Sequence, residues 1–290
     1  MRPRDLFDLC MLALLWGGVY LFVRAAVPAF GPLPLSALQL GIAALVLLPA
    51  WLARERRVGL RRLTRPLVVQ GLVFCALPYA LLAWGAMSMH AGLAALLDAT
   101  APLFAAIVAR CWLGEPIARG RVLGLLLGFG GVVLLVGDGV SVGSGLALAA
   151  VLTAAMLLGV GGLYAQHRLR DTSPLTLTTG SLAVSALALT PFALAARPEE
   201  LPGTRAWAEL LCLAVPCSGL GYLLYYRLVR NVGATRAVAA TFLSPLVALV
   251  AGALYLDEPI TPRTIAGAVV ILAGTALALA GRRDAEVYGA

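Results

Sequence analysis

The chain has 290 residues, of which 61% are hydrophobic and 12% are charged, and its formal net charge is +8. A soluble globular protein carries about 25% charged residues, so most of this surface does not face water. One helix needs roughly 20 apolar residues to cross the hydrocarbon core of a bilayer, and the chain is long enough for about ten such helices with short connections. The composition therefore excludes a soluble protein and predicts an all-α integral membrane protein.

Breaks at proline, glycine and arginine residues divide the chain into ten predicted transmembrane helices. They cover residues 7–27, 34–53, 66–88, 92–112, 120–137, 143–165, 174–195, 207–229, 233–254 and 263–281. The connections between them are too short to hold a soluble domain. The first span is long and contains Trp16 and Arg24, so we interpret it as a retained membrane helix and not as a cleaved signal peptide.

The basic residues, all of them arginines, gather in alternate connections. If the N-terminus lies in the cytoplasm, 18 arginines fall on the cytoplasmic side and four on the outer side. Cytoplasmic loops of membrane proteins are enriched in basic residues, so both termini are predicted to be cytoplasmic. Membrane orientation thus accounts for the positive charge, and we expect no nucleic acid as a partner.

A short motif occurs twice, 143 positions apart, as LGEPI at 113–117 and as LDEPI at 256–260. The same offset pairs Pro102 with Pro245 and gives nine identities over the thirty positions that start at Pro102. Similar composition alone would not place two prolines and a glutamate in register. The pattern indicates an internal duplication.

The duplicated unit contains five helices, with one copy at residues 7–137 and the second at residues 143–281. Because five is odd, the second copy must enter the membrane from the opposite side. Secondary transporters use inverted repeats of this kind for alternating access. The fold prediction is therefore ten transmembrane helices arranged as two inverted five-helix repeats.

The motif has a local structural interpretation in both copies. Proline, here Pro116 and Pro259, suits the first turn of a helix, where its missing N–H is not needed. The preceding residues, Glu115 and Glu258, are pushed towards an extended conformation, and their charge is favourable at the positive end of a helix. We predict that both glutamates mark helix starts, with a role in gating as the alternative.

Three stretches carry a family resemblance: LLWGGVYLFVR at 14–24, HAGLAALLDATAPLFAAIVARCWLGEPI at 90–117, and GYLLYYRLVRNVGATRAVAATFLSPLVALVAGALYLDEPI at 221–260. With these motifs the chain resembles the EamA-type transporters of the drug/metabolite transporter superfamily, over nearly its whole length and as two tandem copies. The resemblance implies a carrier of the bacterial inner membrane, commonly an exporter of metabolites, amino acids or drugs.

Two prolines fall in the middle of predicted spans. Pro102 and Pro245 each free the carbonyl four residues earlier, which belongs to Asp98 in one repeat and to Thr241 in the other. A free backbone group is tolerated in a membrane only where protein or a water-filled cavity satisfies it. We predict helix kinks that face the interior of the bundle and place Asp98 and Thr241 on the translocation path. The alternative is that the kinks only shape the bundle.

Asp98 is the only acidic residue well inside a predicted span. A charged carboxylate costs about 2.5–3.5 kcal/mol at the centre of a membrane helix, so a partner or a function is expected. We interpret it as a proton-coupling site or as a contact for a cationic substrate group, with a structural hydrogen bond as the alternative. Arg24, in the outer half of the first span, could attract a substrate carboxylate, pair with Asp98, or extend to the lipid headgroups.

Aromatic residues complete the predicted path. Trp16, Tyr79, Trp84, Tyr222 and Tyr225 have an apolar body and a polar tip, which suits the wall of a cavity for amphipathic solutes. Such residues are equally typical of the interfacial belt of any membrane protein.

These observations predict a secondary transporter of the bacterial inner membrane. It would export small metabolites, amino acids or amphipathic drugs, in exchange for protons, by alternating access around a midplane cavity. The expected partners are a small-molecule substrate, the lipid bilayer and protons, and the protein would be a monomer or a homodimer. Without a catalytic constellation, a cofactor motif or a metal-ligand pattern in the sequence, we expect no enzymatic activity, no cofactor and no metal. A membrane-embedded enzyme and a non-transporting scaffold or sensor are the alternatives.

Overall fold

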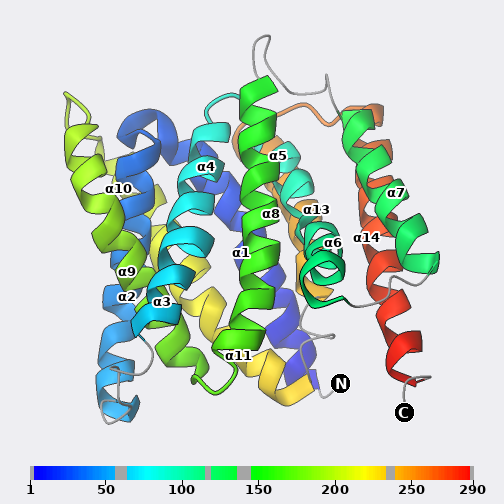
Figure 1. Ribbon diagram of the computed structural model, residues 1–290. Helices are drawn as coiled ribbons and strands as arrows, with labels where there is room; N and C mark the ends of the chain where they lie inside the picture. The colour runs from blue at the N-terminus through cyan, green and yellow to red at the C-terminus, as the bar shows by residue number, and fades with distance from the viewer. Residues whose placement is uncertain (1–2, 56–63, 115–118, 136–144, 233–238, 288–290) are drawn as a thin grey trace.

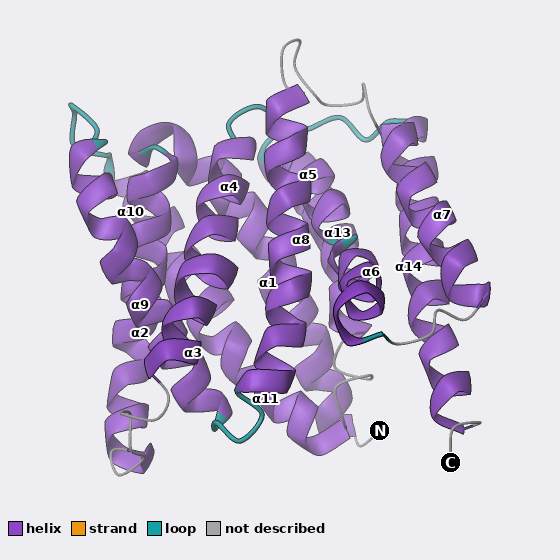
Figure 2. Cartoon of the chain, in the orientation of Figure 1, coloured by secondary structure: helices purple, strands orange, loops and turns teal. Residues whose placement is uncertain are grey.

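Helices make up the described part of the chain. The computed structural model describes residues 3–55, 64–114, 119–135, 145–232 and 239–287, and contains no strand within them (Figure 2). The first half has α1 (Pro3–Phe30), α2 (Pro32–Glu55), α3 (Thr64–Gly71), η2 (Leu72–Ala76), α4 (Leu77–Gly85), α5 (Ala91–Asp98), α6 (Ala101–Leu113) and α7 (Arg119–Leu135). The second half has α8 (Gly145–Arg168), α9 (Pro174–Ala195), α10 (Thr204–Cys212), η3 (Leu213–Leu220), α11 (Gly221–Val232), α13 (Ala239–Tyr255) and α14 (Pro262–Val287).

The length and composition of these helices are those of a multi-pass membrane protein. Among the described residues, seven helical stretches are long and apolar enough to cross a bilayer. Three shorter apolar helices, Val122–Leu134, Leu243–Tyr255 and Pro262–Leu277, lie at the fifth, ninth and tenth predicted spans. Large apolar side chains such as Leu187 and Leu254 are exposed on the outside of the bundle, where lipid rather than water would surround them.

Helices that the 143-residue offset relates to one another lie side by side. The offset carries α2 onto α9 and α7 onto α14, and the members of each pair pack along each other. In Figure 1 the two helices of each pair run in opposite directions, as do α1 and α8, which the same offset relates. The beginning of α1 and the end of α14 lie at the same, lower end of the bundle (Figure 1).

The third and eighth predicted spans are each interrupted by a π-helical segment at the same place. Adding 143 to the bounds of η2 gives residues 215–219, which lie inside η3. A π segment disturbs the backbone hydrogen bonds of the helix around it. Serine hydroxyls supply additional donors there: Ser185 to the carbonyl of Gly71 at 2.7 Å, and Ser218 to the carbonyl of Leu213 at 3.0 Å. Such donors meet the requirement that backbone groups within a membrane be satisfied by the protein.

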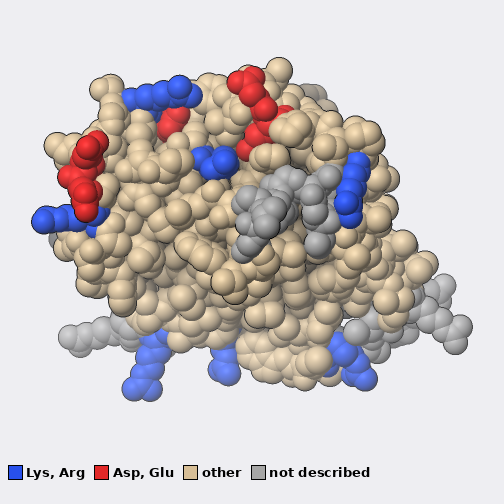
Figure 3. Space-filling view, turned by 90° about the horizontal axis from the view of Figure 1, so that it is seen from above, with Lys and Arg blue, Asp and Glu red and all other residues tan. Residues whose placement is uncertain are grey.

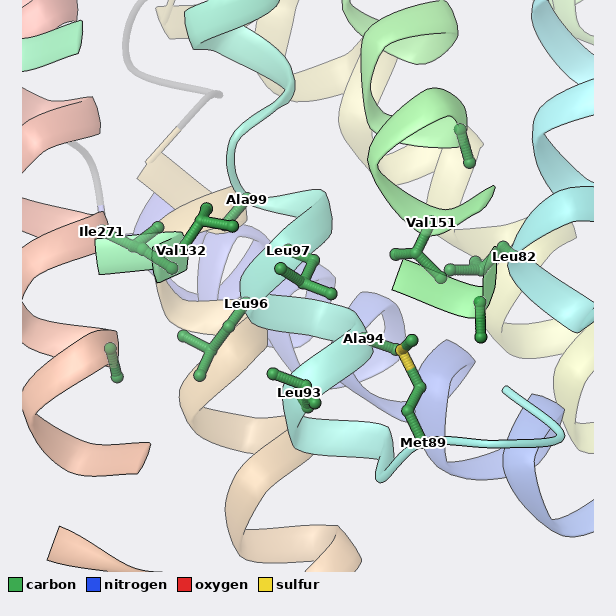
Figure 4. Close-up of a cluster of buried hydrophobic side chains, with 13 residues drawn as sticks. Leu82, Met89, Leu93, Ala94, Leu96, Leu97, Ala99, Val132, Val151 and Ile271 are labelled. Carbon is green, nitrogen blue, oxygen red and sulfur yellow. The ribbon is translucent and has the colours of Figure 1, made fainter. Parts of the chain in front are cut away.

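The short helix α5 lies in the centre of one hydrophobic cluster. Every residue from Ala91 to Leu97 is buried. Figure 4 shows the leucines of α5 between side chains of four other helices: Val132 of α7, Ile271 of α14, Val151 of α8 and Leu82 of α4. Because α5 is surrounded by apolar side chains, its polar contacts are confined to its two ends.

Glycines allow α7 and α14 to approach closely. A Cβ atom at Gly274 of α14 would overlap the backbone of Gly128 in α7 and press on the carbonyl of Gly124. Small residues at such a crossing let membrane helices pack through their backbones, where lipid offers no hydrophobic driving force. These glycines of α7 thus serve packing inside the bundle.

Candidate functional site

One stripe of α1 carries a series of polar and aromatic contacts with other helices. Trp16, Tyr20 and Arg24 follow one another at intervals of four residues, so neighbouring members lie on the same side of the helix, and Asp8 lies eight residues before Trp16. At the beginning of α1, Asp8 forms an ion pair with Arg227 of α11, with 3.1 Å between Oδ2 and Nε. The other three residues form the contacts described next.

Asp98, predicted to lie on the path, accepts a hydrogen bond from Tyr20. The distance from the Tyr20 hydroxyl to Oδ2 of Asp98 is 2.6 Å. The Oδ1 atom of Asp98 is buried and has no hydrogen-bond partner among the described residues. The predicted structural hydrogen bond therefore exists, but it satisfies only one of the two carboxylate oxygens.

The backbone is interrupted directly after Asp98. The fourth span is broken after Asp98, and Pro102 is the second residue of a separate helix, α6. Pro102 thus stands at a helix start inside the apolar stretch Ala91–Trp112, a position where its missing N–H is not needed. Pro245 does lie inside α13. Thr241 belongs to the first turn of α13, and its side chain is outside the described part of the structure.

Two tyrosines at equivalent positions of the predicted repeats contact each other. The hydroxyls of Tyr79 in α4 and Tyr222 in α11 are 2.9 Å apart, and their positions differ by 143 residues. Each tyrosine follows the π segment of its own span within three residues. A pair of equivalent residues can touch only where the two halves of a duplicated structure meet.

Trp16 packs against Tyr222 of this pair and against Tyr225. Its ring lies 6.2 Å from that of Tyr222 in an edge-on arrangement and 5.1 Å from that of Tyr225. All three aromatic residues are half-buried. Trp84, which we also predicted to line the path, is 41% exposed and is not in a ring contact among the described residues. Its exposure is that of a side chain on the outside of the bundle, so the structure does not bring it to the cluster.

At the upper end of the bundle, Glu258 contacts both α5 and α1. It lies in the connection between α13 and α14. Its two carboxylate oxygens accept hydrogen bonds from the backbone N–H of Ala91, the first residue of α5, at 3.0 and 2.9 Å. Arg24 of α1 lies 3.8 Å from the same carboxylate, measured from Nε to Oε1. A carboxylate at this position is stabilised by the positive end of α5 and by the guanidinium together.

These contacts give the partner of Arg24 and correct the prediction for Glu258. Arg24 pairs with Glu258 and not with Asp98. Glu258 does occupy a helix start, but it is the start of α5, and Pro259 precedes α14, which begins at Pro262. The N-cap of α14 is Thr261, whose hydroxyl accepts a hydrogen bond from the N–H of Thr264. The equivalent Glu115 and Pro116 lie outside the described residues.

A depression in the surface surrounds this contact. It is lined by Arg24, His90, Asp257 and Glu258. Asp257 has a φ of 53°, in the left-handed region that turns the chain sharply after α13. Seen from this end, the surface is mostly neither acidic nor basic, and the charged side chains form small separate groups (Figure 3).

Tyr20 was not predicted from the sequence as a site residue, although its hydroxyl donates the hydrogen bond to Asp98. A signal was present, because Tyr20 lies four residues after Trp16 and four before Arg24, both of which were candidates. Residues four apart on a helix are neighbours on its surface. The structure therefore brings together Trp16, Tyr20, Tyr79, Asp98, Tyr222 and Tyr225 as a central cluster, and Arg24 and Glu258 as a separate contact at the upper end.

The sequence is similar to those of several known proteins. It is 26% identical to an uncharacterized transporter of Archaeoglobus fulgidus over 267 residues, which is 92% of this chain and 95% of the relative. It is also 26% identical to the "Probable terminal-alkyne amino-acid exporter" of Streptantibioticus cattleyicolor, covering 99% of this chain and 98% of that one. A solved crystal structure shares the fold with a TM-score of 0.69 at 22% sequence identity, over 98% of this chain and all of the other.

The family profile described as "EamA-like transporter family" matches the sequence twice, at residues 6–137 and 145–280. The two matches together cover most of the 290 residues. The relatives named as transporters extend over nearly the whole chain. The protein therefore belongs to the EamA-like transporter family.

Proposed function

We propose that this protein is a proton-coupled exporter of small metabolites, amino acids or amphipathic drugs in the bacterial inner membrane. It works by alternating access, with ten transmembrane helices, cytoplasmic termini and a central binding site. The observation that carries the proposal is the position of Asp98: a half-buried carboxylate at a helix break within the bundle, held by the hydroxyl of Tyr20. The name of the amino-acid exporter relative supports the direction and the substrate class.

The proposed mechanism needs two halves that can rock against each other. We assign residues 7–137 and 143–281 to inverted five-helix repeats. The antiparallel packing of the equivalent helices α2 with α9 and α7 with α14 supports this assignment, and so does the contact between Tyr79 and Tyr222. With the two tyrosines at the junction of the repeats, the central cluster lies where both halves contribute to one site.

Two ion pairs of α1, one near each end, would break in turn during transport. Near its beginning Asp8 pairs with Arg227, and near its end Arg24 pairs with Glu258. Each pair joins the first proposed repeat to the second at opposite ends of the bundle. Opening the path at either end requires that the pair at that end separate. The two pairs are similarly shielded from water, because the carboxylate of Glu258 is 10% exposed and that of Asp8 is 5% exposed.

Transport into inside-out membrane vesicles tests the proposed function. An exporter that exchanges its substrate for protons accumulates the substrate in such vesicles when respiration acidifies their interior. We expect vesicles with the overproduced protein to accumulate at least one member of a panel of labelled amino acids and amphipathic drugs, and a protonophore to abolish the accumulation. Vesicles without the protein are the control. Accumulation that survives the protonophore would contradict proton coupling, and no accumulation of any member would contradict export.

Cysteine labelling tests the inverted arrangement separately. In a variant without the five native cysteines, single cysteines replace Arg110 near the end of α6 and Asp257 after α13, both of them exposed. We expect a membrane-impermeant thiol reagent to label the Asp257 position in intact cells and the Arg110 position only after the membrane is opened. The two positions are near corresponding corners of the repeats, so labelling of both from the same side would contradict the inversion.

A further inference from the structure

The central cluster contains one acidic group and no basic group among the described side chains. Arg24, the basic residue closest along α1, lies one turn beyond Tyr20 and is engaged with Glu258. The helices packed against α5 are α1, α8, α13 and α14. Their described charged side chains lie towards helix ends, and α13 has none in Ala239–Tyr255. His167 of α8 contacts the carbonyl of Leu163 in its own helix, and Arg263 of α14 donates to the carbonyl of Leu134.

We propose that Asp98 binds the ammonium group of the transported solute, so that the substrates carry an ammonium group and acids without one are excluded. This inference rests on the proposed transport function and names the chemistry of the same site. An ammonium has three donors and no acceptor, and a carboxylate offers acceptors on both oxygens. Oδ2 of Asp98 is already fixed by Tyr20, while Oδ1 is buried without a partner among the described residues.

The hydrogen bond from Tyr20 orients the carboxylate without neutralising it. A phenol donates one hydrogen bond at 2.6 Å and leaves the negative charge uncompensated. A charge in a membrane interior requires a counter-charge, a proton or water. A cationic group on the solute would provide the counter-charge together with a donor for Oδ1.

The aromatic side chains around Trp16 suit the rest of such a solute. Trp16 is one helical turn from Tyr20, and its ring contacts those of Tyr222 and Tyr225. Aromatic faces attract cations and also stack on apolar groups. The cluster therefore offers a charged contact at one end and an aromatic surface beside it, which fits an amine attached to an apolar body.

A carboxylic acid would find no matching partner in the same place. Its negative charge would face that of Asp98, and the described side chains of the cluster include no arginine or histidine to bind it. We therefore expect affinity to fall from an amine to a neutral analogue and further to an acid of similar shape.

Four compounds with the same aromatic ring test this order: phenethylamine, phenylalanine, 2-phenylethanol and 3-phenylpropionate. Binding to the purified full-length protein is measured by calorimetry at one pH. We expect phenethylamine to bind at least about tenfold more tightly than 2-phenylethanol, because hydrogen bonds to charged groups are the stronger ones. Phenylalanine, which has both charged groups, is expected to bind less tightly than phenethylamine, and 3-phenylpropionate is expected to bind most weakly. Equal or tighter binding of 3-phenylpropionate, or binding of none of the four, would overturn the proposal.

Variants then assign the preference to one residue. Asp98→Asn is expected to bind phenethylamine and 2-phenylethanol within about threefold of each other, whereas Asp171→Asn, at an exposed residue outside the cluster, keeps the original order. A preference that survives in Asp98→Asn would overturn the assignment. If that variant does not fold, the order of the four compounds in the unmodified protein still decides. Tyr20→Phe keeps the carboxylate and is expected to keep the preference for the amine.

The experiments distinguish failure of the amine site from failure of the proposed transport function. Proton-dependent accumulation of a solute in inside-out vesicles, without any preference for amines in binding, would reject the amine site and leave the transport function standing. A preference for amines that depends on Asp98, without any accumulation, would reject the transport function and leave the binding site standing.

Discussion

Asp98→Asn is expected to abolish accumulation driven by a proton gradient in inside-out vesicles, to the level of vesicles without the protein. Asparagine keeps the size of the side chain and can still accept a hydrogen bond from Tyr20, but it cannot bind and release a proton. Exchange of a neutral substrate across the membrane without a gradient is expected to continue. The measurement is the initial rate of uptake with and without a protonophore.

The folding of this variant is expected to be little affected. Removing a charge from the membrane interior relieves its desolvation, and the contact with Tyr20 remains, so we expect the free energy of unfolding to change by no more than about 1 kcal/mol. Asp171→Asn serves as the control, because Asp171 is 93% exposed. If Asp98→Asn retains the full gradient dependence, Asp98 has no part in coupling.

Glu258→Ala is expected to open the upper end of the bundle. The substitution removes the acceptor for the N–H of Ala91 and leaves Arg24 without its carboxylate. Hydrogen bonds to a charged group contribute about 1.5–3 kcal/mol each. The loss of one such contact shifts an equilibrium between closed and open forms by roughly 10- to 100-fold. A cysteine at Leu93, which is 4% exposed, reports the change through its rate of reaction with an impermeant thiol reagent.

The matched control is Glu200→Ala, at an exposed residue in the connection between α9 and α10. We expect it to leave the labelling rate at Leu93→Cys unchanged. Arg24→Gln should have a smaller effect than Glu258→Ala, because the bonds to the N–H of Ala91 remain. An unaltered labelling rate in Glu258→Ala would show that this contact does not close the path.

The sequence determined that the bundle consists of apolar helices. The predicted span at 174–195 coincides with α9, Pro174–Ala195. Such accuracy has a physical cause: in lipid every backbone N–H and carbonyl must be satisfied within the protein, so a long apolar segment has little choice but a helix. The motif repeated at an offset of 143 residues is likewise a property of the sequence alone.

The interruptions within the predicted spans could not be predicted from the sequence. The span predicted at 92–112 is two helices, α5 and α6, and the span at 66–88 contains the π segment η2. Hydropathy averages over a whole span and is insensitive to a break of two residues. The broken backbone depends on contacts from other helices, such as the hydroxyl of Ser185 on the carbonyl of Gly71.

The partners of the polar residues were decided by the tertiary structure. Asp98 and Arg24 were both recognised as candidates, but Asp98 contacts Tyr20, 78 residues away, and Arg24 contacts Glu258. Composition and spacing fix which residues share a face of one helix, as for Tyr20 between Trp16 and Arg24. The rotation of that helix against its neighbours depends on the packing of the entire bundle, and this rotation determines which charges meet.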